Sequence, residues 1–148
     1  MRFVAVRIPI RRRRRRTCAI ADVLAEMGGE SEAAFHLAFA LIDWTGRIER
    51  GAASDGVRLA HRLLTPIAKA WSTDVGVEVA SLGVQVHGGM GFIEETGAAQ
   101  HYRDARITTI YEGTNGIQSI DLVTRKLAAN GGASVWALLD ELNGIVKQ

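Results

Sequence analysis

Cysteine, proline and aromatic residues are scarce in this sequence of 148 residues. The single cysteine, Cys18, excludes a disulfide bond within the chain, which is typical of proteins from a reducing compartment and favours a cytoplasmic location. The two prolines, Pro9 and Pro66, leave long stretches free to form helices. No apolar run is long enough to cross a bilayer, so no membrane span is predicted.

The hydrophobic content of 47% and the charged content of 23% are typical of one soluble globular domain. The formal net charge of +2 is unevenly distributed, because six of the 18 basic residues form the run Arg11–Arg16. The other 12 basic residues stand against 16 acidic ones, so the rest of the chain is mildly acidic. This distribution gives no indication of a nucleic-acid-binding face outside the arginine run.

Residues 1–20 differ from the rest, because six adjacent like charges repel one another and no helical period is present. We expect residues 1–20 to be a disordered or non-native tail, such as a mistranslated start, and residues 21–148 to be one helical domain. The alternative interpretation is a basic arm that binds nucleic acid or anionic lipid. The aromatic residues or the attached basic face that usually accompany such an arm are not visible here.

Apolar residues recur at spacings of three and four along most of the chain, which predicts helices. We expect them over residues 31–50, 55–87, 96–106, 114–129 and 134–146. Apolar residues on several faces of the second stretch indicate a helix that is packed on several sides. With no alternating strand pairs, the fold class is all-α, a bundle of about four main helices.

Several residues are typical of helix ends. Ser31, Thr96 and Thr114 are expected N-caps, whereas Gly51 and the glycines of residues 130–132 are expected stops. Pro66 should kink the second helix or begin a new first turn. The β-rich segment ITTIYEGT is expected to be a short extended loop.

Two glycine-containing motifs stand out. In VQVHGGMGF, glycines after a helix allow a left-handed cap and close backbone approach to a ligand, but on its own the motif is also compatible with a plain helix-ending loop. In TTIYEGTNGIQ, a lone acid, Glu112, lies on a glycine-flanked turn ahead of a helix, where free N–H groups favour electron-rich ligand atoms. Alone, Glu112 could equally be a solvated loop acid. No histidine has a Cys or acid at ligand spacing, so no metal site is predicted.

Together, in this order and with HYRDARI between them, the two motifs resemble the C-terminal helical domain of the acyl-CoA dehydrogenases. The resemblance runs from about Ser31 to Leu127. It implies an FAD enzyme that oxidises the Cα–Cβ bond of an acyl-CoA to a 2-enoyl-CoA and passes electrons to an electron-transfer flavoprotein. It also implies a homo-oligomer, either a dimer or a tetramer.

The resemblance assigns roles to residues of both motifs. Glu112 falls on the position of the catalytic base. The N–H of Glu112 itself or that of Gly113, the expected substrate-binding residue, would bind the thioester oxygen and stabilise the developing enolate. The expected FAD-binding residues are Thr114, Asn115, Gly116, Gln85, Val86, His87, Gly88 and Gly89. The last five are expected to touch the adenine-nucleotide half of an FAD bound mainly by a neighbouring subunit.

The family's N-terminal helical domain and middle β domain have no counterpart in this sequence, and its opening C-terminal helix is not visible in residues 1–20. Three interpretations therefore stay open. The chain is the C-terminal part of an acyl-CoA dehydrogenase, a helical association module without activity of its own, or, as a minor alternative, a basic-arm nucleic-acid binder.

Overall fold

The computed structural model describes residues 16–146 of the chain. Its elements in chain order are α1 (Arg16–Glu49), α2 (Asp55–Val86), α3 (Gly89–Phe92), a 3-10 turn η1 (Glu94–Thr96), α4 (Ala98–Thr108), α5 (Asn115–Asp121), a π-helical turn η2 (Leu122–Lys126), a 3-10 turn η3 (Ala129–Gly132) and α6 (Ala133–Val146). These residues contain no strand, so the predicted all-α fold is confirmed. None of the helices described combines the length and the apolar character needed to cross a membrane.

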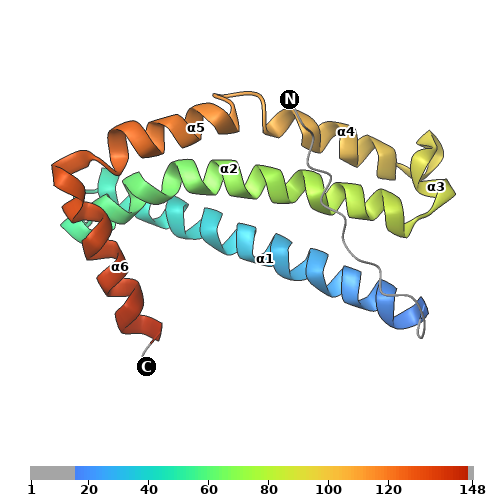
Figure 1. Cartoon of the computed structure of the whole chain (residues 1–148), viewed down its shortest axis with the longest axis horizontal. Coiled ribbons are helices and arrows are strands. Elements are labelled where there is room, and N and C mark those ends of the chain that lie inside the picture. Colours follow the sequence, from blue (N-terminus) through green and yellow to red (C-terminus); the bar gives the residue numbers. More distant parts are fainter. Residues whose placement is uncertain (1–15, 147–148) are drawn as a thin grey trace.

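Helix α2 is the central element of the fold (Figure 1), with α1 along one side and α4 and α5 along the other. Most of the buried residues lie on α2; they are Ala60, Leu63, Pro66, Ala68 and Val75, joined by Gly91 on α3 and Ala98 at the start of α4. The predicted packing of this helix on several sides is therefore confirmed. Most other apolar side chains remain partly or largely exposed, because three helices laid side by side enclose little interior.

Pro66 lies inside α2, which continues through it as one helix, so no new helix begins there. Its ring is among the most deeply buried groups of the chain. A proline lacks the N–H that would bond the carbonyl four residues earlier. Packing of the apolar ring in the core offsets that loss, and Pro66 is best described as a core residue.

Helix α1 begins at Arg16, well before the predicted start at Ser31. The Ser31 hydroxyl donates to the carbonyl of Met27 at 2.7 Å, a bond made in the interior of a helix, so its predicted role as an N-cap is wrong. Met27 lies against Gly83 of α2 and helps to pack this first part of the helix. Residues 1–15, and with them most of Arg11–Arg16, lie outside the described residues. Gly51 ends α1 with a φ of 69°, as predicted.

The helix over the HYRDARI segment also starts differently. Thr96 donates its hydroxyl to the carbonyl of Met90 at 2.8 Å and does not cap α4. The residue before α4 is Gly97, whose φ of 77° only glycine adopts without strain. Helix α4 then continues to Thr108, and Glu112 and Gly113 have left-handed backbone, so the expected extended loop over ITTIYEGT is wrong.

The end of the chain agrees with prediction. Asn130, Gly131 and Gly132 have φ values of 53°, 64° and 83°, and such left-handed backbone ends a helix. Helix α6 follows, and in Figure 1 it crosses the end of the other helices and runs away from them.

The partly buried carboxyl group of Glu30 on α1 makes the free energy of unfolding depend on pH. Burial raises the pKa of Glu30 above its ordinary value, and repulsion from Glu78 and Glu26 raises it further. Because the folded pKa exceeds the unfolded one, ionised Glu30 destabilises the fold above its folded pKa. We expect Glu30→Gln to stabilise the chain at neutral pH by about 0.5 kcal/mol or less.

This gain should shrink as the pH falls through the raised folded pKa and vanish below the unfolded value, where both states carry the proton. Urea unfolding of both proteins at several pH values measures it. Glu49→Gln, an exposed change on the same helix at a residue that makes no ion pair among residues 16–146, is the control and should leave the unfolding midpoint nearly unchanged at each pH. A gain that persisted at acid pH would contradict the explanation.

Candidate functional site

The segment between α4 and α5 is a tight turn that carries Glu112, and in Figure 1 it stands out at one edge of the helical layer. Glu112 has a φ of 53° and Gly113 a φ of 82°, so the chain passes through two consecutive left-handed residues. A non-glycine residue in this conformation is uncommon and clusters at functional sites. The sequence predicted a turn here but not the left-handed backbone of the acid itself.

Backbone hydrogen bonds close the Glu112 turn, which we define as residues 109–115. The N–H of Tyr111 donates to the carbonyl of Ile107 at 3.1 Å, and the N–H of Asn115 donates to the carbonyl of Thr109 at 3.2 Å. Among the described residues, the N–H groups of Glu112 and Gly113 have no hydrogen-bond partner. The Glu112 side chain is exposed, so both its carboxylate and these donors are open to a ligand.

Thr114 caps α5 as predicted, because its hydroxyl accepts from the N–H of Ile117 at 3.2 Å. Gln118, one turn further on, donates weakly from its amide to the carbonyl of Glu112 at 3.5 Å. A Cβ on Gly113 would lie 3.2 Å from that amide nitrogen, in addition to the strain of its positive φ. The positive φ therefore favours glycine at position 113, and a Cβ there would also require the Gln118 amide to shift slightly.

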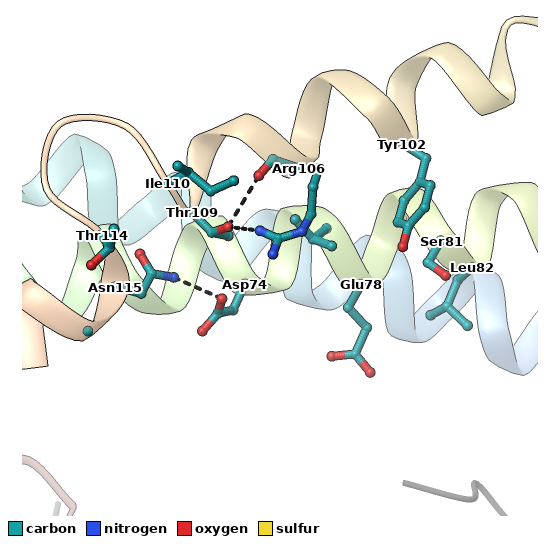
Figure 2. A pocket seen from close by; sticks show the side chains of 12 residues that line it. Asp74, Glu78, Ser81, Leu82, Tyr102, Arg106, Thr109, Ile110, Thr114 and Asn115 are labelled. Atoms are coloured by element: carbon teal, nitrogen blue, oxygen red, sulfur yellow. Dashed lines mark hydrogen bonds between the residues drawn. The ribbon is translucent and has the colours of Figure 1, made fainter. Parts of the chain in front are cut away.

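A groove of about 700 Å³ lies beside this turn, between α2, α4 and the start of α5. Figure 2 shows Tyr102 and Arg106 entering it from α4, and Asp74 and Glu78 lying along α2. Thr114, Asn115 and Gly116 also line it. The structure thus brings three of the predicted flavin-binding residues to one edge of a groove large enough for part of a cofactor or substrate.

The α2 and α4 residues of this groove were missed as site residues in the sequence, although a signal was present. Asp74, Glu78 and Ser81 recur at spacings of four and three on α2, and Tyr102 and Arg106 lie four apart on α4. Such spacings place polar groups on one helix face.

The alternating charges of the HYRDAR segment are typical of an Arg-Asp-Arg ion-pair network, but the structure shows another arrangement. Arg103 pairs with Glu94 of η1 at 3.1 Å. Arg106 instead donates to the hydroxyl of Thr109 at the start of the turn (Figure 2). Asp104 accepts from the Gln100 amide at 2.7 Å and makes no ion pair among residues 16–146.

The other predicted cofactor segment lies elsewhere. Gln85 and Val86 end α2, His87 caps it, Gly88 follows with a φ of 62°, and Gly89 begins α3. The start of α5 instead lies beside Asp74, and eleven residues of helix separate Asp74 from Gln85, or roughly 17 Å at 1.5 Å per residue. Figure 1 likewise shows α3 near one end of α2 and α5 toward the other. The two motifs therefore lie apart along α2 within one chain.

The residues of the turn fit one edge of an FAD site. Gly113 and Gly116 carry no side chain, the N–H of Gly113 is free, and the groove opens next to them. The Asn115 side chain is an exception, because α2 occupies its polar atoms. At the other segment, a Cβ on Gly88 or Gly89 would meet nothing within 4 Å, so open space is available for a ligand.

Comparison with known proteins identifies the family. The family model "Acyl-CoA dehydrogenase, C-terminal domain" matches residues 10–127 of this chain. The chain therefore belongs to the acyl-CoA dehydrogenase family, through its C-terminal domain, and the resemblance stated from the two motifs is confirmed.

Comparison with individual relatives supports this family assignment. The chain is 50% identical over 116 residues to the 3-methylmercaptopropionyl-CoA dehydrogenase of Ruegeria pomeroyi, covering 76% of this chain and 20% of that one. It is 34% identical over 100 residues to acyl-CoA dehydrogenase family member 11 of Caenorhabditis elegans, covering 68% and 16%. The solved structure "Bd2924 apo-form" superimposes with a TM-score of 0.72 at 27% identity, covering 86% of this chain and 25% of that one. The wording GMGFIEETGAAQHYRDARI also favours the branch of the first relative. This chain thus spans about a fifth of the length of that relative.

Proposed function

We propose that this chain supplies the catalytic base and one edge of the flavin site of an acyl-CoA dehydrogenase, which oxidises an acyl-CoA at Cα–Cβ to the 2-enoyl-CoA. The observation that carries the proposal is Glu112, an exposed carboxylate on a left-handed turn with free N–H groups beside it. That turn lies within the segment that matches the family.

The chemistry requires a base and an electron sink on opposite sides of the substrate, because a C–H proton beside a thioester is very weakly acidic. Glu112 takes the α proton, and the free N–H of Gly113 donates to the thioester oxygen as negative charge develops there. Bound FAD supplies the acceptor for the β hydrogen, which leaves with its electron pair. The electrons then pass to an electron-transfer flavoprotein.

A chimera tests this function. Residues 10–127 would replace the matching segment of the Ruegeria pomeroyi relative, so that the rest of a complete chain surrounds the Glu112 turn. We expect stoichiometric FAD and reduction of the flavin by an acyl-CoA. A chimera that held FAD but was not reduced by any of a panel of acyl-CoA substrates, each of which reduced the parent or a known family member, would overturn the proposal.

A second candidate, an association module without activity, is favoured by a different observation. Phe35, Phe39 and Ile42 lie on one face of α1 with 60%, 55% and 65% of their surface exposed. The rings of Phe35 and Phe39 stack with centroids 4.3 Å apart. An apolar face of this kind indicates a contact surface.

We expect the isolated chain to be helical, to associate and to bind FAD poorly. Sedimentation and flavin absorbance of the purified protein measure both properties. Phe35→Ser combined with Phe39→Ser should weaken association, because it removes the stacked apolar pair. Glu49→Ser, which changes an exposed polar residue on the same helix, is the control and should leave association unchanged. Stoichiometric FAD in the isolated chain would contradict the expectation.

A further inference from the structure

The side chain of Asn115 joins the start of α5 to the middle of α2. Its Oδ1 accepts from the Nζ of Lys69 at 2.9 Å. Its Nδ2 donates to the Asp74 carboxylate at 2.8 Å and to the carbonyl of Ala70 at 3.1 Å. The hydroxyl of Thr73 lies within 3.0 Å of the Nδ2 and 3.2 Å of the Oδ1. Both polar atoms of the Asn115 amide are therefore hydrogen-bonded to α2.

The charges around the amide fix its orientation. A cation, Lys69, faces the amide oxygen, and an anion, Asp74, faces the amide nitrogen. Reversing the amide would place its donor against the ammonium and its acceptor against the carboxylate. Charge-assisted bonds of this kind are stronger than bonds between neutral groups, so residue 115 is held in one rotamer against α2.

Asn115 also closes the Glu112 turn, because its backbone N–H donates to the carbonyl of Thr109 at 3.2 Å. The two ends of the turn are therefore joined at a residue that α2 holds in place. Between them lie Glu112 and Gly113, with left-handed backbone. The left-handed conformation of a non-glycine residue such as Glu112 costs roughly 1–2 kcal/mol, and it persists only where the surrounding structure imposes it.

We propose that Asn115 is a positioning residue, which keeps the Glu112 turn in its left-handed conformation by clamping its closing residue to Lys69 and Asp74 of α2. The inference rests on the proposed function, because it matters to catalysis only if Glu112 is the base. It also changes the predicted role of Asn115, from a residue whose side chain lines the flavin to one that sets the backbone carrying the base.

The test uses the full chain and needs neither flavin nor substrate. In Asn115→Ala, we expect the NMR chemical shifts and coupling constants of Glu112 to lose their left-handed signature. The amide of residue 115 should exchange with solvent roughly tenfold faster or more, while amides of α1 keep their protection. Glu78→Gln, a change one turn further along α2 at a side chain that lines the same groove but makes no hydrogen bond to Asn115, should change neither property.

Asn115→Asp provides a second, isosteric change. It keeps the acceptor that faces Lys69 but places a carboxylate against that of Asp74, so the turn should loosen although the shape is unchanged. If Asn115→Ala fails to fold, Lys69→Met removes one anchor and should give a smaller change at the same amides. The proposal would be overturned if Glu112 kept its left-handed NMR signature in the folded Asn115 variants or in Lys69→Met.

Failure of this proposal and failure of the proposed function are distinguishable. A turn that stays ordered without Asn115 leaves the base role of Glu112 intact. The turn could instead loosen as expected in the Asn115 variants while the chimera holds FAD but is not reduced by acyl-CoA. That pair of results would contradict the proposed function and support the role of Asn115.

Discussion

Glu112→Gln in the flavin-loaded chimera lowers turnover by about 10²–10⁴-fold, the range expected when a positioned general base is removed. The amide has nearly the shape of the carboxylate but cannot accept the α proton at neutral pH. FAD content should stay unchanged, because Glu112 lies on an exposed turn and makes no ion pair among residues 16–146. Stopped-flow reduction of the flavin by acyl-CoA, together with the absorbance of bound FAD, measures both effects.

A matched control separates loss of the base from loss of any exposed acid. Glu95→Gln removes an exposed carboxylate on η1, outside the turn, and should leave flavin reduction within about twofold of the unchanged chimera. Flavin reduction by Glu112→Gln at the rate of the unchanged chimera would show that another group takes the proton.

Gly91→Ala is the substitution with the largest expected effect on stability. A Cβ at position 91 would lie 2.2 Å from the carbonyl oxygen of Val84 and 2.8 Å from the Cβ of His87. Because the first neighbour is backbone, the clash can be relieved only by moving α3 away from the last turn of α2. We expect a loss of about 3 kcal/mol, a large part of the 5–15 kcal/mol typical of whole domains.

Gly89→Ala is the control for this prediction, because a Cβ there would meet nothing within 4 Å and its backbone is not left-handed. Urea unfolding followed by circular dichroism should show a much lower midpoint for Gly91→Ala and a nearly unchanged one for Gly89→Ala. Equal midpoints for the two variants would show that α3 shifts without cost.

The contrast between these two glycines illustrates what the sequence could and could not predict about the site. The GGMG pattern indicated that glycines matter after α2, and TTIYEGTNG indicated a turn with a capped helix behind it. A pattern of letters does not tell a glycine needed for close packing, such as Gly91, from one that leaves open space, such as Gly89. That distinction depends on which backbone atoms of α2 lie opposite, which only the folded chain determines.

The helix starts show the same limit. Thr114 caps α5 as its sequence pattern predicted, but Ser31 and Thr96 have the same kind of side chain and do not cap. Ser31 bonds back to its own helix, and Gly97 supplies the left-handed residue that precedes α4. Packing of α1 along α2 extends the helix past a residue that local preference would have made its first. The length and central position of α2 were predictable because a long, many-sided apolar pattern leaves few alternatives.

The three left-handed residues before α6 have a consequence for how the chain opens. The match to the family ends at residue 127, and Asn130, Gly131 and Gly132 then interrupt the helix ahead of α6. Hinges of this kind allow one element to unfold while its neighbours stay folded. Amides of α6 should therefore exchange through a local opening that costs less free energy than global unfolding. Amides of α2, which carries nearly all of the buried core, should exchange only when the whole helical layer comes apart.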